Sequence, residues 1–336
     1  MKNITKISLF LVVIVIVLGA YTRLTDAGLG CPDWPGCYGF IKPPLTEDRM
    51  LQAESAFPNA PIDHAKAWNE MIHRYAAGIL GLLIFAITVI AIRRKIKQPE
   101  LNKPFKHPIG LGALIIFQAA LGMWTVTMML QPAIVMAHLL GGFTTFTLLA
   151  LLYLRESEFV PPAMDYGLKR LLPLAWLVLI AVLIQIALGG WVAANYAALA
   201  CVDLPICQGN WTERLNFTGA FSLVEAETYE FGVHTYDERL TMHVSHRIGA
   251  IVVLGAMLVL LAQLWRNARS RWFRSAAAVL TALLFLQITL GVLNVVLSLP
   301  LLIAVAHNAV GALLLVSMAI LVFALKKLSA KEATHG

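Results

Sequence analysis

Eight apolar runs, each long enough to cross a lipid bilayer, constrain this chain more than any other feature. A hydrocarbon core about 30 Å thick needs roughly 20 apolar residues in a helix. Such runs lie near 7–24, 71–92, 109–127, 132–154, 171–195, 243–264, 275–297 and 301–324. Of 336 residues, 59% are hydrophobic and 13% are charged, whereas about a quarter of a soluble domain is charged. The sequence therefore predicts an all-α membrane protein with eight transmembrane helices.

The first run could also be read as a signal peptide, because Lys2 and Lys6 precede it. It lacks a convincing cleavage site, and the internal repeat described below requires it. We therefore expect it to be a helix.

The basic residues predict the orientation. The N-terminus, the loops 93–108, 155–170 and 265–274, and the C-terminal tail carry 18 of the 26 Lys and Arg. By the positive-inside rule this side is cytoplasmic. We expect a multi-pass protein of the bacterial cytoplasmic (inner) membrane with both termini in the cytoplasm. The net charge of +7 then reflects topology, and we expect contact with membrane lipid and none with nucleic acid.

The chain repeats itself after about 170 residues. Four landmarks recur in the same order: His73-Arg74 as His246-Arg247, FQAALG (117–122) as LQITLG (286–291), AHLLGG (137–142) as AHNAVG (306–311), and CPDWPGC (31–37) as CVDLPIC (201–207). This pattern predicts two parallel-repeat four-helix bundles, residues 1–160 and 161–336. Parallel repeats also occur in transporters, but the broken helices and midplane charges of transporters are missing from the pattern.

Four histidines occupy repeat-matched places, namely His73, His138, His246 and His307. The topology puts each near the outer end of its helix. Two imidazoles at matched depth on facing helices can hold a haem iron between them. A single histidine near a membrane interface is more often merely hydrogen-bonded, but the matched set favours haem. Zinc is less favoured, because no cysteine or carboxylate cluster completes a tetrahedral site at that depth.

Neighbouring residues also suit haem. Arg74 and Arg247 stand at the outer mouth, where a haem propionate could accept a charge-assisted hydrogen bond. Gln118 and Gln287 are matched and could line the two sites. Small residues in the same segments let a flat macrocycle, or simply another helix, approach closely; these are Gly122, Gly141, Gly142, Gly249, Gly291 and Gly311.

The two halves differ in front of their first histidine. Glu70 stands three residues before His73, whereas His243 stands three residues before His246. The i, i+3 spacing places Glu70 and His73 on one face of a helix, where the carboxylate could relay protons. Glu70 could equally be a first-turn acid favoured by the helix dipole.

The four cysteines form two pairs on the outer side, Cys31 with Cys37 and Cys201 with Cys207. An oxidising periplasm permits disulfides, and the even number leaves no unpaired thiol. Structural and redox-active disulfides are both compatible with the sequence. The outer loops, about 25–70 and 196–242, are expected to cover the two sites. They contain no nucleotide-binding fingerprint, and Trp34, Tyr38, Trp211 and Tyr229 could mark the membrane interface.

Taken together, GAYTRLTDAGLGCPDWPGC (19–37), NEMIHR (69–74), AHLLGG, SHRIGA and AHNAVG resemble the haem A synthase family over nearly the whole chain. That family oxidises the C8 methyl group of haem O to a formyl group, which gives the haem A of terminal oxidases. The resemblance implies an oxidoreductase in which His73 and His138 flank the substrate haem O and Glu70 is catalytic. It further implies that His246 and His307 ligate a haem b cofactor, and that Cys31 and Cys37 form a disulfide linked to activity.

A haem held by two histidines cannot bind oxygen at its own iron unless one ligand leaves. We therefore expect either that His73 or His138 dissociates, or that electrons are removed and water supplies the oxygen atom. The sequence names no electron donor or acceptor, and a complex with haem O synthase is one partner to test. The alternatives are a di-haem b electron-transfer protein and a haem carrier. The first would need haems near opposite membrane faces, and the second would have no use for Glu70.

Overall fold

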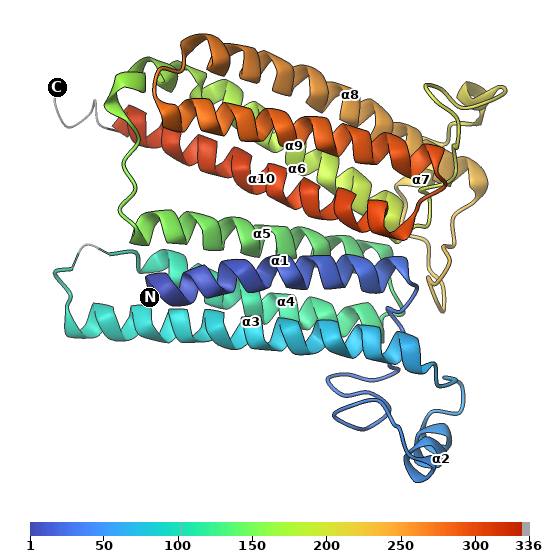
Figure 1. The fold of residues 1–336 in the computed structure, drawn as a ribbon. Coiled ribbons are helices and arrows are strands. Elements are labelled where there is room, and N and C mark those ends of the chain that lie inside the picture. Colours follow the sequence, from blue (N-terminus) through green and yellow to red (C-terminus); the bar gives the residue numbers. More distant parts are fainter. Residues whose placement is uncertain (102, 331–336) are drawn as a thin grey trace.

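The computed structural model describes residues 1–101 and 103–330, in which all regular elements are helices and none is a strand (Figure 1). Its long helices are α1 (Lys2–Leu24), α3 (His64–Lys97), α4 (Lys106–Thr127), α5 (Pro132–Glu156), α6 (Leu172–Ala194), α8 (Tyr236–Asn267), α9 (Arg271–Val296) and α10 (Leu301–Ala330). Shorter elements are α2 (Glu47–Ala56), η1 (Ala163–Leu171), η2 (Trp211–Arg214) and α7 (Phe217–Ala220).

The predicted eight spans are confirmed. Eight helical segments of the described residues are long and apolar enough to cross a membrane, with η1 and α6 counted as one segment. Residue 102 of the predicted 93–108 loop and residues 331–336 of the predicted second half lie outside the described residues.

Two helices begin earlier than the apolar runs suggest. The run at 71–92 belongs to α3, which starts at His64, and the run at 243–264 belongs to α8, which starts at Tyr236. Asp63 caps α3 by accepting from the backbone N–H groups of Ala65 and Lys66, and Thr235 caps α8 within a capping box. Capping lets polar residues extend a helix beyond its apolar stretch, so hydropathy alone misses these first turns.

The helices pack as two neighbouring groups. In Figure 1, α1, α3, α4 and α5 lie together, and α6, α8, α9 and α10 lie beside them. Helices α1, α5, α6 and α10 contact one another between the groups. Of the apolar window of α10, 67% is buried, against 17–28% for the other spans. The outer helices therefore turn their apolar side chains toward lipid, while α10 packs against protein.

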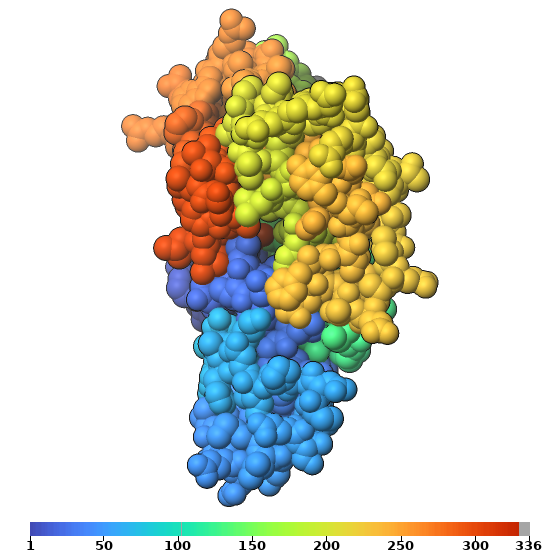
Figure 2. Space-filling view, turned by 90° about the vertical axis from the view of Figure 1, so that its right-hand side faces the viewer, coloured from blue at the N-terminus to red at the C-terminus, as the bar shows by residue number. Residues whose placement is uncertain are grey.

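The long loops gather at one end of the molecule. Helices α2 and α7 and the loops around them lie at that end, while α1 begins and the last turns of α10 lie at the other (Figure 1). Figure 2 looks onto the loop end, where the first loop projects as a separate lobe and the second loop covers the other group of helices. The parallel relation of the two halves remains a prediction.

Candidate functional site

All four repeat-matched histidines lie in the first three turns of their helices. His73 is in α3, His138 in α5, His246 in α8 and His307 in α10. These four helices begin at the loop end of the molecule (Figure 1). All four imidazoles are half-buried. The structure therefore brings the histidines to one end of the bundle.

The first pair is spaced for a metal between the rings. The ring centres of His73 and His138 are 6.5 Å apart, and the ring planes are almost perpendicular, at 89°. A metal–imidazole bond is about 2 Å long, so two such bonds and two ring radii separate the ring centres by roughly 6 Å. In the second half, His246 and His307 are close enough to interact electrostatically.

Each histidine ring lies against a glycine of the preceding span. A Cβ atom built on each glycine would approach the Cε1 atom of the ring closely. The four pairs and distances are Gly19 with His73 (2.9 Å), Gly122 with His138 (3.5 Å), Gly189 with His246 (2.9 Å) and Gly291 with His307 (3.2 Å). Because glycine has no side chain, each imidazole can lie directly against the backbone of the preceding helix.

Gly19 and Gly189 were missed by the sequence reasoning above. The signal that could have found them is their mutual offset of 170 residues, which is the same offset as that of the cysteine motifs. Gly122 and Gly291, by contrast, were expected to lie near the sites.

Glutamine side chains contact three of the four rings. The Gln185 amide nitrogen lies 2.9 Å from His246 Nδ1, and the Gln287 amide nitrogen lies 3.2 Å from His307 Nε2. When the Gln118 amide is oriented so that its nitrogen and its oxygen are both hydrogen-bonded, the nitrogen lies 2.9 Å from His138 Nδ1. Gln118 and Gln287 were anticipated from their matched positions, and Gln185 was not.

Haem fits this donor set better than a bare metal ion does. Among residues 1–101 and 103–330, no three His, Cys, Asp or Glu side chains gather closely enough to hold a metal ion by themselves. The buried Nδ1 atoms of His73 and His307 have no hydrogen-bond partner in this part of the chain. Gly142, one turn after His138, has nothing within 4 Å of where a Cβ would stand. Two histidines facing each other would suit a macrocycle, which would supply the other four ligands itself.

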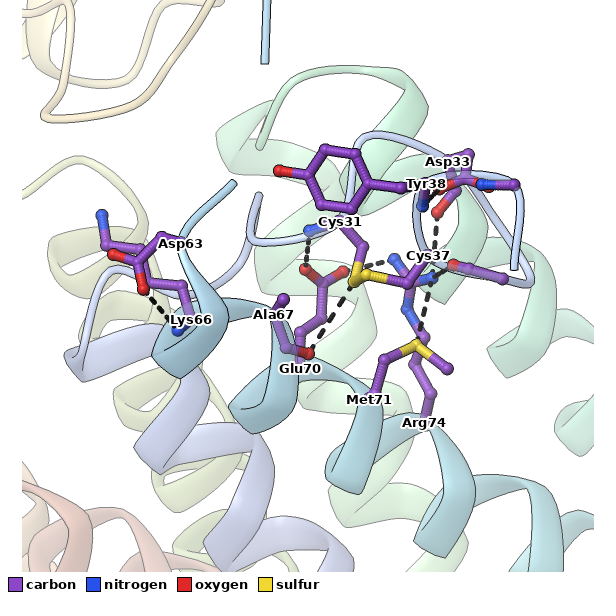
Figure 3. Close-up of a disulfide and its surroundings, with 12 residues drawn as sticks. Cys31, Asp33, Cys37, Tyr38, Asp63, Lys66, Ala67, Glu70, Met71 and Arg74 are labelled. Carbon is purple, nitrogen blue, oxygen red and sulfur yellow. Dashed lines mark hydrogen bonds and ion pairs between the residues drawn. A yellow bond between two sulfur atoms is a disulfide. The ribbon is translucent and has the colours of Figure 1, made fainter. Parts of the chain in front are cut away.

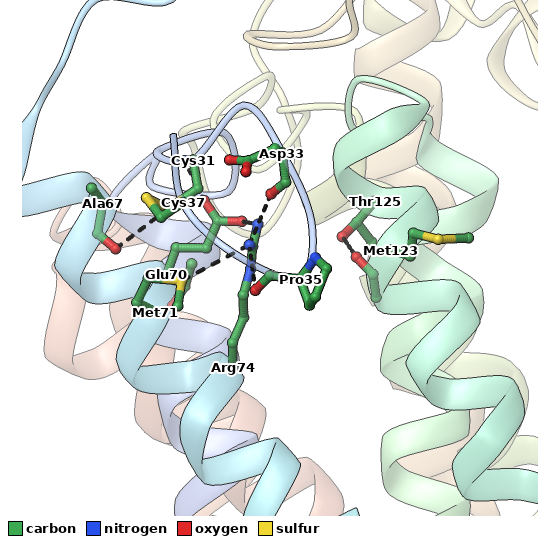
Figure 4. Close-up of polar contacts among 12 residues, drawn as sticks. Cys31, Asp33, Pro35, Cys37, Ala67, Glu70, Met71, Arg74, Met123 and Thr125 are labelled. Atoms are coloured by element: carbon green, nitrogen blue, oxygen red, sulfur yellow. Dashed lines mark hydrogen bonds and ion pairs between the residues drawn. A yellow bond between two sulfur atoms is a disulfide. The ribbon is translucent and has the colours of Figure 1, made fainter. Parts of the chain in front are cut away.

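Glu70 is tied to the first disulfide loop. Its side chain is almost completely buried, accepts from the backbone N–H of Cys31 at 2.9 Å and pairs with Arg74 (Figure 3). Arg74 also donates to the carbonyl oxygens of Asp33, at 2.9 Å, and Gly36 (Figure 4). Glu70 and Arg74 thus join the start of α3 to the loop that Cys31 and Cys37 close.

The second half repeats this arrangement without the carboxylate. Arg247 donates to the carbonyl oxygens of Cys201 at 2.6 Å and Asp203 at 2.7 Å. Its Nε donates to Nε2 of His243 at 3.2 Å, where the first half has Glu70. Both arginines are therefore engaged with the loops, and the expected propionate contacts stay predictions.

Both cysteine pairs are bonded in the structure. Cys31–Cys37 and Cys201–Cys207 each close a short loop above the helix that carries the first histidine of that half. Cys31 and Cys37 are fully buried, and the first loop packs onto α3 (Figure 3). The geometry supports a structural role, and a redox role stays untested.

The aromatic residues of the loops divide into two kinds. Trp34 is exposed and Trp211 is half-buried, while Tyr38 and Tyr229 are buried within the loops. Their place at the membrane interface stays a prediction. Tyr38 donates to the Pro61 carbonyl oxygen at 2.9 Å. Burial first, and then the carboxylate of Asp63, raises the pKa of Tyr38 above its usual range. The phenol is therefore neutral, and its O–H remains available as the donor to Pro61.

The chain is similar to known proteins over most of its length. A family model described as COX15-CtaA, cytochrome oxidase assembly protein, matches residues 2–319. A protein of Shewanella oneidensis named "Heme A synthase" is 49% identical over 315 residues, which cover 93% of each chain. A "Heme A synthase" of Beijerinckia indica is 30% identical, covering 91% of this chain and 87% of its own. One of Nitrosospira multiformis is 27% identical, with 92% and 88% covered.

Proposed function

Since the chain belongs to the COX15-CtaA family of cytochrome oxidase assembly proteins, we propose that it is a haem A synthase. In this proposal it is an oxidoreductase that converts the C8 methyl group of haem O to a formyl group. Its product, haem A, serves terminal oxidases. The relatives named "Heme A synthase" match over 93% and 91% of this chain, and the family model matches residues 2–319.

The observation that carries the proposal is the spacing of the pair His73–His138, with Glu70 one turn before His73 in helix α3. The ring spacing of 6.5 Å suits an iron between two imidazoles, and Glu70 lies one turn before His73 on the same helix face. We assign haem O, the substrate, to this pair. Glu70 is the titratable side chain that can hold or move a proton next to it.

The second pair, His246 and His307, is assigned to a haem b cofactor. Its surroundings support holding rather than converting a haem, because His243 replaces the carboxylate and the amides of Gln185 and Gln287 contact both rings.

When bound, haem supplies the one-electron and oxygen chemistry that side chains lack. The protein's own residues position the imidazoles, Glu70 and the two arginines. The four glycines let the imidazoles stand close to the preceding helices, and the disulfide loops hold Glu70 and the two arginines at the rim. Arg74 and Arg247 are the cations nearest the sites and would offset the negative charge of haem propionates.

The proposed setting is the bacterial inner membrane, with both termini in the cytoplasm and the histidine end facing outward. The two halves, 1–160 and 161–336, would be parallel repeats, each with one haem site. The matched contacts of Gly19 and Gly189 with their histidines support that relation. Four histidines at one end of the bundle disfavour a di-haem protein that carries electrons across the membrane.

Pigment analysis tests the function. The full-length protein is purified from cells that make haem O, and its haems are extracted, separated and identified by mass. We expect haem b together with haem O or haem A. Haem b alone at both sites would overturn the proposal in favour of electron transfer or haem delivery.

A matched pair of variants tests Glu70. E70Q is expected to retain haem O and to make no haem A, whereas H243Q, at the equivalent position of the second half, is expected to keep converting. A normal yield of haem A from E70Q would remove the carboxylate from the mechanism.

A further inference from the structure

We propose that a cavity at the end of the molecule opposite the outer loops binds the phosphate group of an anionic phospholipid, whose acyl chains lie along helix α6. The cavity lies between η1 and the turn that joins α8 to α9. Since α8 begins at the loop end, this turn is at the other end (Figure 1), which is the cytoplasmic side in the proposed setting. The inference does not depend on the proposed haem chemistry.

The cavity has the size of a headgroup site. Its volume is about 280 Å³, whereas pockets for drug-sized ligands begin at roughly 300 Å³. It therefore has room for a phosphate group and not for a whole lipid. Gly167 of η1 lines it, and a Cβ built on Gly167 would have no heavy atom within 4 Å. The space beside η1 is open to a ligand.

Two arginines line the cavity, Arg170 of η1 and Arg269 of the α8–α9 turn. Arg170 donates one hydrogen bond, from Nη2 to Oδ1 of Asn267 at 2.6 Å, and a guanidinium has five N–H donors. The side chain of Arg269 donates no hydrogen bond within residues 1–101 and 103–330. Both guanidinium groups therefore have donors left for an anion, and charge-assisted hydrogen bonds to phosphate are among the strong ones.

Asp165 is the acidic residue of the lining, and its carboxylate is already engaged. The side chain is buried. Its Oδ1 accepts from the backbone N–H of Arg269 at 2.6 Å, and its Oδ2 accepts from that of Ser270 at 2.9 Å. These two bonds hold the α8–α9 turn against η1, so the carboxylate positions Arg269 at the cavity.

The arginines of this corner have no acidic partner. Within the described part of the chain, none of the following forms an ion pair: Arg170, Arg266, Arg269, Arg271 and Arg274. At the same end of the first half, in contrast, Arg94 pairs with Glu156 at 3.1 Å. The positive-inside rule accounts for basic residues at both corners, but it does not require them to line a cavity. Basic pockets on the cytoplasmic side of membrane proteins bind anionic lipid headgroups.

The surface next to the cavity suits a lipid rather than a soluble phosphate. Helix α6 follows η1 directly. Its exposed residues Leu177, Ile180 and Ile184 have i, i+3, i+7 spacing and form one apolar stripe. Trp176, exposed near the start of α6, is a residue type enriched at membrane–water interfaces. A lipid phosphate in the cavity places the acyl chains on this stripe.

Lipid titration of the purified full-length protein in detergent tests the inference, with bound lipids counted by native mass spectrometry. We expect one phosphatidylglycerol per chain to bind more tightly than any further copy, and phosphatidylcholine not to compete for that site. Two soluble competitors distinguish a lipid from a free phosphate: glycerophosphoglycerol, which is the same headgroup without acyl chains, and inorganic phosphate. Displacement of the lipid by either competitor at equal concentration would overturn the lipid assignment.

A matched pair of variants tests the cavity against general surface charge. R170Q/R269Q should weaken the tight site about 30-fold, since a basic residue near an anionic lipid contributes about a fivefold gain in affinity. R93Q/K97Q removes the same charge from two exposed side chains near the end of α3, at the same end of the molecule, and should leave the tight site unchanged. Equal losses in the two variants would show unspecific attraction and overturn the inference.

Two single variants keep the inference testable if the loss of the Arg170–Asn267 hydrogen bond unfolds the double variant. R269Q removes no side-chain hydrogen bond within the described residues and should weaken binding about fivefold. G167F fills the cavity without changing any charge and should abolish the tight site. Phosphatidylglycerol binding at wild-type strength in both variants would refute the proposed site.

Discussion

Replacing Arg74 with methionine should destabilise the first half more than the equivalent change destabilises the second. Arg74 pairs with Glu70, whose side chain is 6% exposed, while its own is 12% exposed. Methionine preserves much of the length and volume but removes the charge. Glu70 then remains a buried carboxylate whose remaining partners are the backbone N–H groups of Cys31, at 2.9 Å, and Gly30.

The expected cost follows from that uncompensated charge. Removing one partner of a buried ion pair typically costs about 3–5 kcal/mol, so R74M should lower the free energy of unfolding by about that amount. Arg247, in contrast, donates its hydrogen bonds to loop carbonyls and the ring of His243. It interacts with the Asp203 carboxylate only electrostatically, without an ion pair to a buried acid. R247M loses charged hydrogen bonds without stranding an anion and should cost about 1–3 kcal/mol.

A double-mutant cycle isolates the pair. Since E70Q removes the stranded charge, R74M/E70Q should be less destabilised than the sum of its single variants by about 1–3 kcal/mol. The measurement is reversible unfolding of the purified full-length protein in mixed micelles with increasing SDS, followed by tryptophan fluorescence. Equal costs for R74M and R247M, together with additive behaviour in the cycle, would refute the reasoning.

Three other changes test separate parts of the structure. G19A places a Cβ 2.9 Å from the ring of His73 and should lower haem occupancy of the first half about 10-fold; G255A, which meets nothing within 4 Å, should not alter the extracted haem. D63A removes an N-cap that accepts two backbone N–H groups and should cost about 1 kcal/mol in the same micelle titration. D165A strands two backbone donors before α9, which approach the carboxylate at 2.6 and 2.9 Å. It should cost about 1–3 kcal/mol, and a cost within error of zero would exclude a structural role for that carboxylate.

Local chemistry was enough to predict the spans and the candidate histidines. The length of an apolar run depends only on neighbouring residues, so all eight spans could be located before the structure was known. The internal repeat singled out His73, His138, His246 and His307 because a matched offset is visible in the linear sequence. The polar first turns of α3 and α8 were missed, since a cap extends a helix without adding hydropathy.

The partners of the polar side chains were decided by the tertiary structure. The donors of Arg74 meet the disulfide loop and Glu70, two partners that the sequence did not indicate. That loop lies about 40 residues earlier in the chain, and its path over α3 is not a local property.

The tertiary structure also decides which face of each helix is turned toward the other helices. The apolar runs that contain Gly19, Gly189 and Gln185 could face lipid in any rotation about the helix axis. Hydropathy therefore determines that such a helix crosses the membrane, but not which side chains face the neighbouring helix. That choice is made by close packing between helices, where glycine admits an imidazole and an amide meets a ring nitrogen. The sequence by itself determined the spans and the matched histidines, and helix packing determined what each histidine touches.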